Sequence, residues 1–74
     1  MNKARRKEIA EIVEIMRGAV DRLEFVQNEE QEAFDNLSEG LQATERGETM
    51  ENAVSEIETA VNSVTEAIDA IEML

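Results

Sequence analysis

The chain has 74 residues and a net charge of −11, and it contains no cysteine, histidine or tyrosine. We expect one domain, residues 1–74, which is too short to bury a large core and has no residues for a disulfide or a histidine-ligated zinc site. Without cysteine, histidine and tyrosine, the common pairs of nucleophile and base in enzymes lack members, so we expect no catalytic residues, no cofactor and no enzymatic activity.

The N-terminal part of the chain differs in charge from the rest. Residues 1–22 carry six basic and four acidic residues, a net charge of +2, whereas residues 23–74 carry one basic and fourteen acidic residues, a net charge of −13. The larger part would repel nucleic acid, so we expect neither DNA nor RNA as a partner. No apolar run has the length of a signal peptide or a membrane span, so we expect a cytoplasmic protein without a membrane partner.

A basic cluster opens the first predicted helix. Its residues are Lys3, Arg5, Arg6 and Lys7. Positive charge at a helix N-terminus opposes the helix dipole, so another group should compensate it. One interpretation is pairing, within or between hairpins, with Glu66, Asp69 and Glu72 at the end of the second helix. The other is an anion site for nucleotides or RNA, formed where several chains meet, although no aromatic side chain lies near it for base stacking.

An apolar seam predicts the first helix. Steps of alternately four and three residues follow one helix face, the spacing of a helix that packs on a long partner. The seam positions are Ile9, Val13, Met16, Val20, Leu23, Gln27, Glu30, Phe34 and Leu37. The polar Gln27 and Glu30 indicate either a seam that drifts toward solvent or a polar device that fixes register, and drift is the simpler account.

Between the helices, the segment NLSEG has the form of one capped turn. Asn36 and the glutamate three residues later resemble a capping box, and Gly40 would supply a left-handed stop. Thr44 is a natural N-cap for the second helix. Gly47 lowers helix propensity, which indicates a close approach to the end of the first helix.

Arg46 is the only basic residue after residue 22. Its simplest partner is Asp35, Glu39 or a neighbouring chain, and the alternative is a place in a binding site. The segment DNLSEG begins like an EF-hand calcium loop. However, Leu37 at the third position and Arg46 at the twelfth cannot bind calcium, so we expect no metal site.

The same alternation of four-residue and three-residue steps predicts the second helix. It starts at Met50, and every position that it reaches is apolar. Its seam positions are Met50, Val54, Ile57, Val61, Val64, Ile68 and Ile71. A second row lies beside each seam: Ile12, Ala19, Val26 and Ala33 on the first helix, and Ala53, Ala60, Ala67 and Leu74 on the second. We expect an all-α antiparallel hairpin with helices at about 3–35 and 45–73. Its extra apolar rows predict assembly into a dimeric four-helix bundle or a larger helical oligomer.

The loop motif resembles that of a family of short acidic hypothetical proteins from bacteriophage and prophage genomes. The segment DNLSEGLQATERGE follows the family pattern D-N-[LM]-P-E-x-L-Q-x-[ST]-E-R-[GY]-E, except that Ser38 stands where the family commonly has proline. The resemblance covers most of the chain, and the loop motif is its specific part. It implies a phage-type origin and a small accessory role, and it implies no reaction.

Two functional classes follow. The first is an interaction protein that binds itself and a host protein, which it inhibits during phage growth; the second is a structural or assembly scaffold. Anion or nucleotide binding at the basic end of an oligomer is a further alternative. Mimicry of DNA fits poorly, because the second helix carries one acid per roughly 5 Å, against one charge per ~1.7 Å of duplex.

Overall fold

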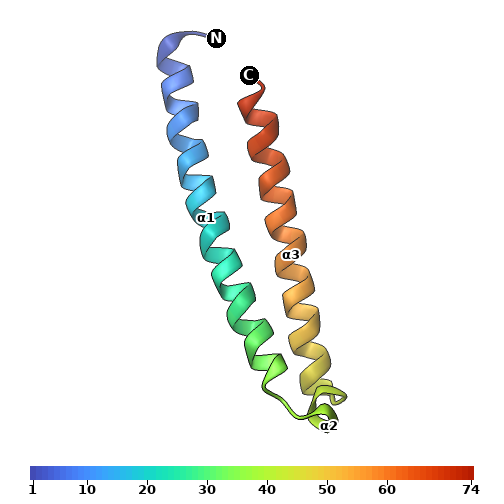
Figure 1. The fold of residues 1–74 in the computed structure, drawn as a ribbon. Coiled ribbons are helices and arrows are strands. Elements are labelled where there is room, and N and C mark those ends of the chain that lie inside the picture. Colours follow the sequence, from blue (N-terminus) through green and yellow to red (C-terminus); the bar gives the residue numbers. More distant parts are fainter.

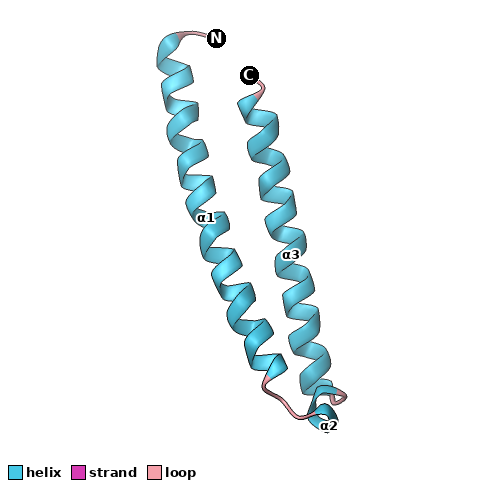
Figure 2. Cartoon of the chain, viewed as in Figure 1, coloured by secondary structure: helices cyan, strands magenta, loops and turns pink.

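The computed structural model describes all 74 residues as two long antiparallel helices joined by a short helical turn (Figure 1). Helix α1 spans Lys3–Asp35, α2 spans Glu39–Gln42 and α3 spans Glu45–Glu72. No strand is present (Figure 2). The predicted all-α hairpin is therefore confirmed, and both chain termini lie at the end opposite the loop (Figure 1).

Helix α1 begins at a side-chain cap that the sequence analysis did not single out. The Oδ1 atom of Asn2 accepts a hydrogen bond of 2.9 Å from the backbone N–H of Arg5. This bond satisfies one of the free N–H groups at the helix start. The first turn contains no acidic residue, so its basic side chains do oppose the helix dipole.

The predicted seams form the inner face of the hairpin. Every predicted seam position is buried or half-buried, including Leu37, which lies two residues after the end of α1. Val13, Val20 and Ile68 are the most enclosed side chains, with 7%, 9% and 3% of their surface exposed. Five further seam residues pack against them: Ile9, Met16, Val61, Val64 and Ile71. The core therefore lies in the half of the hairpin that contains the termini.

Gln27 and Glu30 also stay on the inner face. Both residues are half-buried, and the Nε2 atom of Gln27 donates a hydrogen bond of 3.3 Å to the carbonyl oxygen of Val54 on α3. A seam that had drifted toward solvent would leave these side chains exposed. The drift interpretation is therefore wrong for Gln27, which bonds to α3, and Glu30 is half-buried in the seam without a hydrogen bond to α3.

The N-cap of the short turn lies two residues later than predicted. Asn36 ends α1 in a helical conformation, with its backbone N–H bonded to the carbonyl oxygen of Glu32 at 3.0 Å. It therefore cannot be an N-cap, which needs an extended backbone. Ser38 has that extended backbone, and its Oγ atom accepts a hydrogen bond of 3.4 Å from the N–H of Leu41. Gly40 lies inside α2 without a positive φ, so the predicted capping box and left-handed stop are both wrong.

The start of α3 is close to the prediction. Thr44 is the N-cap residue, but its hydroxyl donates to the carbonyl oxygen of Leu41 and does not accept a bond from the helix. Gly47 is buried, and a Cβ atom there would lie 2.6 Å from the carbonyl carbon of Gln42 and 2.8 Å from its Cα. The predicted close approach exists, but its partner is the end of α2 and not the end of α1.

The hairpin is a thin rod. Its Cα atoms extend over 58 × 15 × 12 Å, with a radius of gyration of 17.1 Å. A compact domain of this length has a radius of gyration of about 11 Å. Each long helix thus has one long neighbour and leaves most of its circumference open.

Candidate functional site

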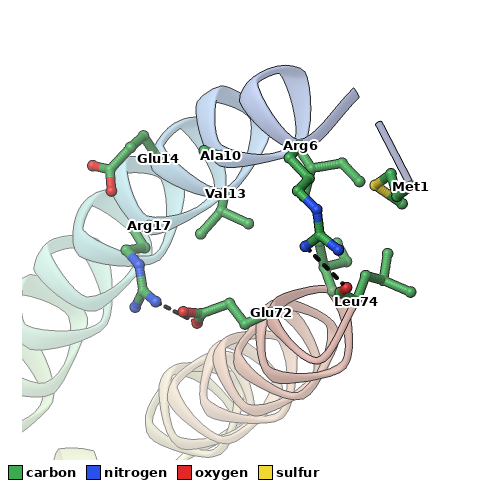
Figure 3. A pocket seen from close by; sticks show the side chains of 10 residues that line it. Met1, Arg6, Ala10, Val13, Glu14, Arg17, Glu72 and Leu74 are labelled. Carbon is green, nitrogen blue, oxygen red and sulfur yellow. Dashed lines mark hydrogen bonds and ion pairs between the residues drawn. The ribbon is translucent and has the colours of Figure 1, made fainter. Parts of the chain in front are cut away.

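The basic end of α1 lies beside the end of α3. A cavity of about 300 Å³ opens between the two helices at this place (Figure 3). Arg6, Val13 and Arg17 reach toward it from α1, and Glu72 and Leu74 line it from the other side (Figure 3). The cavity brings one member of the predicted basic cluster, Arg6, together with the end of the chain.

One ion pair crosses this cavity. The Nη2 atom of Arg17 donates to the Oε1 atom of Glu72 at 2.5 Å, and each side chain is 48% exposed. Arg17 was not among the predicted site residues, although its position directly after the seam residue Met16 could have indicated a contact across the helices. Glu72 therefore pairs with Arg17 and not with the basic cluster.

Arg6 is the only member of the basic cluster whose side chain forms a hydrogen bond. Its Nη1 atom donates a hydrogen bond of 3.3 Å to the carbonyl oxygen of Leu74. A cation is favourable there, because the last carbonyl groups of a helix are the negative end of its dipole. The predicted compensation of the cluster by acidic side chains of the same chain is therefore wrong. Arg6 meets a carbonyl group instead.

The rest of the predicted binding residues are free within the hairpin. Lys3, Arg5 and Lys7 are exposed and make no side-chain hydrogen bond or ion pair. Arg46 is also exposed and unpaired, so its predicted pairing with acids of its own chain is wrong, while pairing with a neighbouring chain stays a prediction. Arg46 lies at the loop end, so the hairpin holds it far from the basic cluster along its 58 Å length.

The ion pair distinguishes the two faces of the hairpin. Arg17 and Glu72 each follow a seam residue, whereas the members of the second apolar rows each precede one. Residues on either side of a seam position point to opposite sides of a helix, because each residue turns the helix by about 100°. Since Arg17 and Glu72 meet across the helix pair, the two second rows lie together on the other face.

We name these surfaces the charged face, which contains Arg17 and Glu72, and the alanine face. The alanine face consists of Ile12, Ala19, Val26, Ala33, Ala53, Ala60 and Ala67. Ile12 and Val26 are 41% and 48% exposed, and of the five alanines only Ala53 is half-buried. The fold of one chain therefore leaves this apolar face open to solvent.

Leu74 does not belong to the alanine face. It was predicted as the last member of the row on the second helix, but α3 ends at Glu72 and the chain turns after it. Leu74 instead lines the cavity that contains the Arg17–Glu72 pair, and it is 61% exposed. The prediction assumed that the helix continues to residue 74, but α3 ends two residues before Leu74.

The exposed surface of the hairpin is larger than that of a compact protein. Its solvent-accessible area is 5710 Å². A folded monomer of 8.3 kDa exposes about 4,600 Å². The excess is about 1,100 Å², which is more than the roughly 800 Å² that each partner buries in a standard protein interface.

Three further observations concern membranes, metals and relatives. Neither long helix contains a stretch that is long and apolar enough to cross a bilayer. No three acidic side chains converge in a way that could hold a metal ion. No protein-family model, curated protein or solved structure matches this chain. The resemblance of the loop motif to phage proteins therefore stays a prediction.

Proposed function

We propose that the chain is a non-enzymatic binding protein that works in the cytoplasm as a homo-oligomeric helical bundle, with a dimer of hairpins as its basic unit. The open alanine face carries this proposal. An exposed apolar stripe that follows both long helices is typical of an interaction site. A chain this small gains stability from association, which supports the same conclusion.

The charge of the bundle supports a protein as its further partner. We define the closed half as residues 23–58, next to the loop, and the open half as residues 1–22 and 59–74. The closed half carries one basic and eleven acidic residues, a net charge of −10, and the open half a net charge of −1. Such an acidic surface attracts a basic patch on another protein and accelerates its binding.

The resemblance to phage proteins favours a host protein as that partner, which the bundle would inhibit by occupying its basic surface. The alternative is a scaffold, in which the bundle spaces other phage components. Affinity capture from host lysate, followed by mass spectrometry, separates the two. One dominant host protein that is released by salt supports the inhibitor, whereas capture of phage structural proteins alone supports the scaffold.

The oligomer itself is tested by light scattering. We expect a mass of at least twice 8.3 kDa at micromolar concentration. The helicity should fall on dilution, because folding and association are linked in a small obligate oligomer. A fully helical monomer that is insensitive to dilution would overturn the proposal.

An anion site at the open end is a second candidate function. It is favoured by one observation: Lys3, Arg5 and Lys7 are unpaired beside a cavity that Arg6 and Arg17 line. A ligand that binds only the folded protein raises its melting temperature. A panel of phosphate, linear nucleotides and cyclic nucleotides should therefore raise the melting temperature of the natural protein and not that of the variant with Arg5→Gln and Arg6→Gln. No shift with any of them, together with no retention of short RNA, would remove this candidate.

A further inference from the structure

We infer that the alanine face is the contact between two copies of this chain, and that the two hairpins dock head to tail, so that the loop of each lies beside the open end of the other. This inference rests on the proposed oligomer. It goes beyond that oligomer in two respects: it says which face is buried between the copies and in which relative direction the two hairpins lie.

The composition of the two faces decides which of them is buried. The charged face holds Arg17 and Glu72, and the groove next to that pair is lined by Asp21 and Asp69. Removing these ionised groups from water would cost more free energy than their pairing returns. The residues of the alanine face are apolar, and charged side chains such as Arg22 and Glu29 lie beside it near Val26. Burying it therefore removes fewer ionised groups from water than burying the charged face would.

The size of the alanine face suits a partner helix pair. Its members recur every seven residues, so they form a stripe of about 30 Å on α1 and about 20 Å on α3. Alanine side chains allow helix axes to approach to about 8 Å, and Ile12 and Val26 provide larger side chains that can fill the spaces between them. The whole hairpin exposes about 1,100 Å² more than a compact protein of its mass, so each copy has surplus surface for an interface that buries roughly 800 Å² per partner.

Charge then decides the direction of docking. Two hairpins that docked with their loops together would place two closed halves, each with a net charge of −10, side by side. Head-to-tail docking separates the closed halves and brings each one beside the open half of its partner, where Lys3, Arg5 and Lys7 are unpaired. Like charges repel and opposite charges attract across an interface, so the head-to-tail dimer has the lower free energy.

This arrangement also forms a closed assembly. A twofold axis through the middle of the alanine face, perpendicular to the rod, brings the same surface of both copies together. The exposed Arg46 at the loop then comes near the open end of the partner, where acidic residues of α3 are available. The dimer thus gives a partner to both groups of free cations in the hairpin.

Spin labels can measure the direction of docking, because the chain has no natural cysteine. Glu39→Cys places one label in the loop of each copy, and Glu8→Cys places one near the open end; both positions are exposed. In the head-to-tail dimer we expect the two loop labels to lie more than about 40 Å apart, since they are near opposite ends of a rod 58 Å long. The two Glu8→Cys labels should be similarly distant.

A mixture of the two labelled proteins provides the control. Its mixed dimers should add a distance below about 25 Å that neither pure sample contains, because neighbouring helices pack about 8–10 Å apart. A loop-to-loop distance below about 25 Å in the pure Glu39→Cys sample would overturn the direction of docking and leave the proposed oligomer intact. A monomeric mass in light scattering would overturn the proposed oligomer itself.

The face is tested by a matched pair of substitutions. Ala60→Glu on the alanine face should reduce the dimer fraction at least tenfold at a fixed concentration, whereas Ala10→Glu, which lines the cavity on the charged face, should leave it unchanged. Equal loss of the dimer in both variants, or loss only in Ala10→Glu, would overturn the assignment of the face.

If Ala60→Glu does not fold, the accessibility of a cysteine at each of the two positions tests the face instead. A maleimide reagent should modify Ala60→Cys at least tenfold more slowly than Ala10→Cys, and equal rates would overturn the assignment.

Discussion

The three buried side chains of the hairpin lie in its open half, whereas the half-buried hydrogen bonds of its side chains lie in its closed half. The polar contacts of the open half, Arg17–Glu72 and Arg6–Leu74, are exposed. Val13, Val20 and Ile68 form the aliphatic core near the termini. Near the loop, Gln27 bonds to the backbone of α3, and the Nε2 atom of Gln42 donates to the carbonyl groups of Phe34 in α1 and of Leu37 just after it. The open half therefore has the most deeply buried apolar side chains, and the closed half adds half-buried hydrogen bonds to a less enclosed seam.

The two halves differ in what they contribute: the open half mainly stabilises the hairpin, and the closed half mainly fixes how its helices align. Apolar burial is roughly proportional to area and has no direction, so the open half can supply free energy without fixing how the helices align. Hydrogen bonds require defined distances and angles, so the contacts of the closed half can fix the alignment while adding little net stability. The closed half also holds nearly all of the net negative charge, which disfavours close packing there.

The largest expected effect compares one substitution in both halves. Ile68→Ala in the open half should lower the free energy of unfolding by about 4 kcal/mol, because Ile68 is 3% exposed and its removal leaves a cavity. Ile57→Ala in the closed half should cost about 2 kcal/mol, because that site is only half-buried and water can fill the space. Urea unfolding at one fixed protein concentration measures both values. A greater cost for Ile57→Ala would reverse the comparison.

The next effect tests the close packing of the closed half. Gly47→Ala would place a Cβ atom 2.6 Å from the carbonyl carbon of Gln42, and a backbone cannot move away cheaply, so we expect a loss of about 1–3 kcal/mol. Gly40→Ala is the control, because nothing lies within 4 Å of its Cβ position. It should raise stability by about 0.5–1 kcal/mol through lower entropy of the unfolded chain. Equal effects of the two variants in thermal unfolding would mean that α2 does not pack on α3 as described.

A smaller effect concerns the hydrogen bonds of Gln42. Its Nε2 atom donates to the carbonyl oxygens of Phe34 and Leu37, both at 3.2 Å. Gln42→Ala should cost about 1–2 kcal/mol, because both carbonyl groups are left without this donor in a half-buried place. Gln31→Ala removes an exposed bond to Asp35 and should cost less than about 0.5 kcal/mol. If the two variants melt at the same temperature, the contact between the loop and α1 does not stabilise the hairpin.

The sequence predicts the seams correctly because burial follows the helical period. Sixteen positions were assigned to the two seams, and the structure encloses every one of them at least in part. Gln27 also lies on the inner face, although it is polar, because the geometry of the helix sets the direction of a side chain whatever its polarity. The same regularity predicted an additional apolar row on each helix, and that row is the basis of the alanine face.

The loop and the ion pair were harder to predict because they depend on choices between equivalent residues. Asn36 and Ser38 are both good N-caps, and which one serves depends on where α1 ends. Glu72 faced several cations at the open end, and its pairing with Arg17 depends on the exact register of the helices. The asparagine at position 2 could have been recognised, because it directly precedes the helical pattern.

The smallest expected effect belongs to the Arg17–Glu72 pair in the open half. Both side chains are 48% exposed, so water and salt screen their attraction, and the pair should contribute less than about 1 kcal/mol. A double-mutant cycle with Arg17→Gln and Glu72→Gln isolates this contribution from the loss of each charge. Arg22→Gln is the control, because it removes the same charge from α1 but no ion pair. The coupling should vanish in 1 M salt, where the Debye length is about 3 Å. A coupling above about 2 kcal/mol that survives this salt would show that polar contacts stabilise the open half as well, and the division between the two halves would then be wrong.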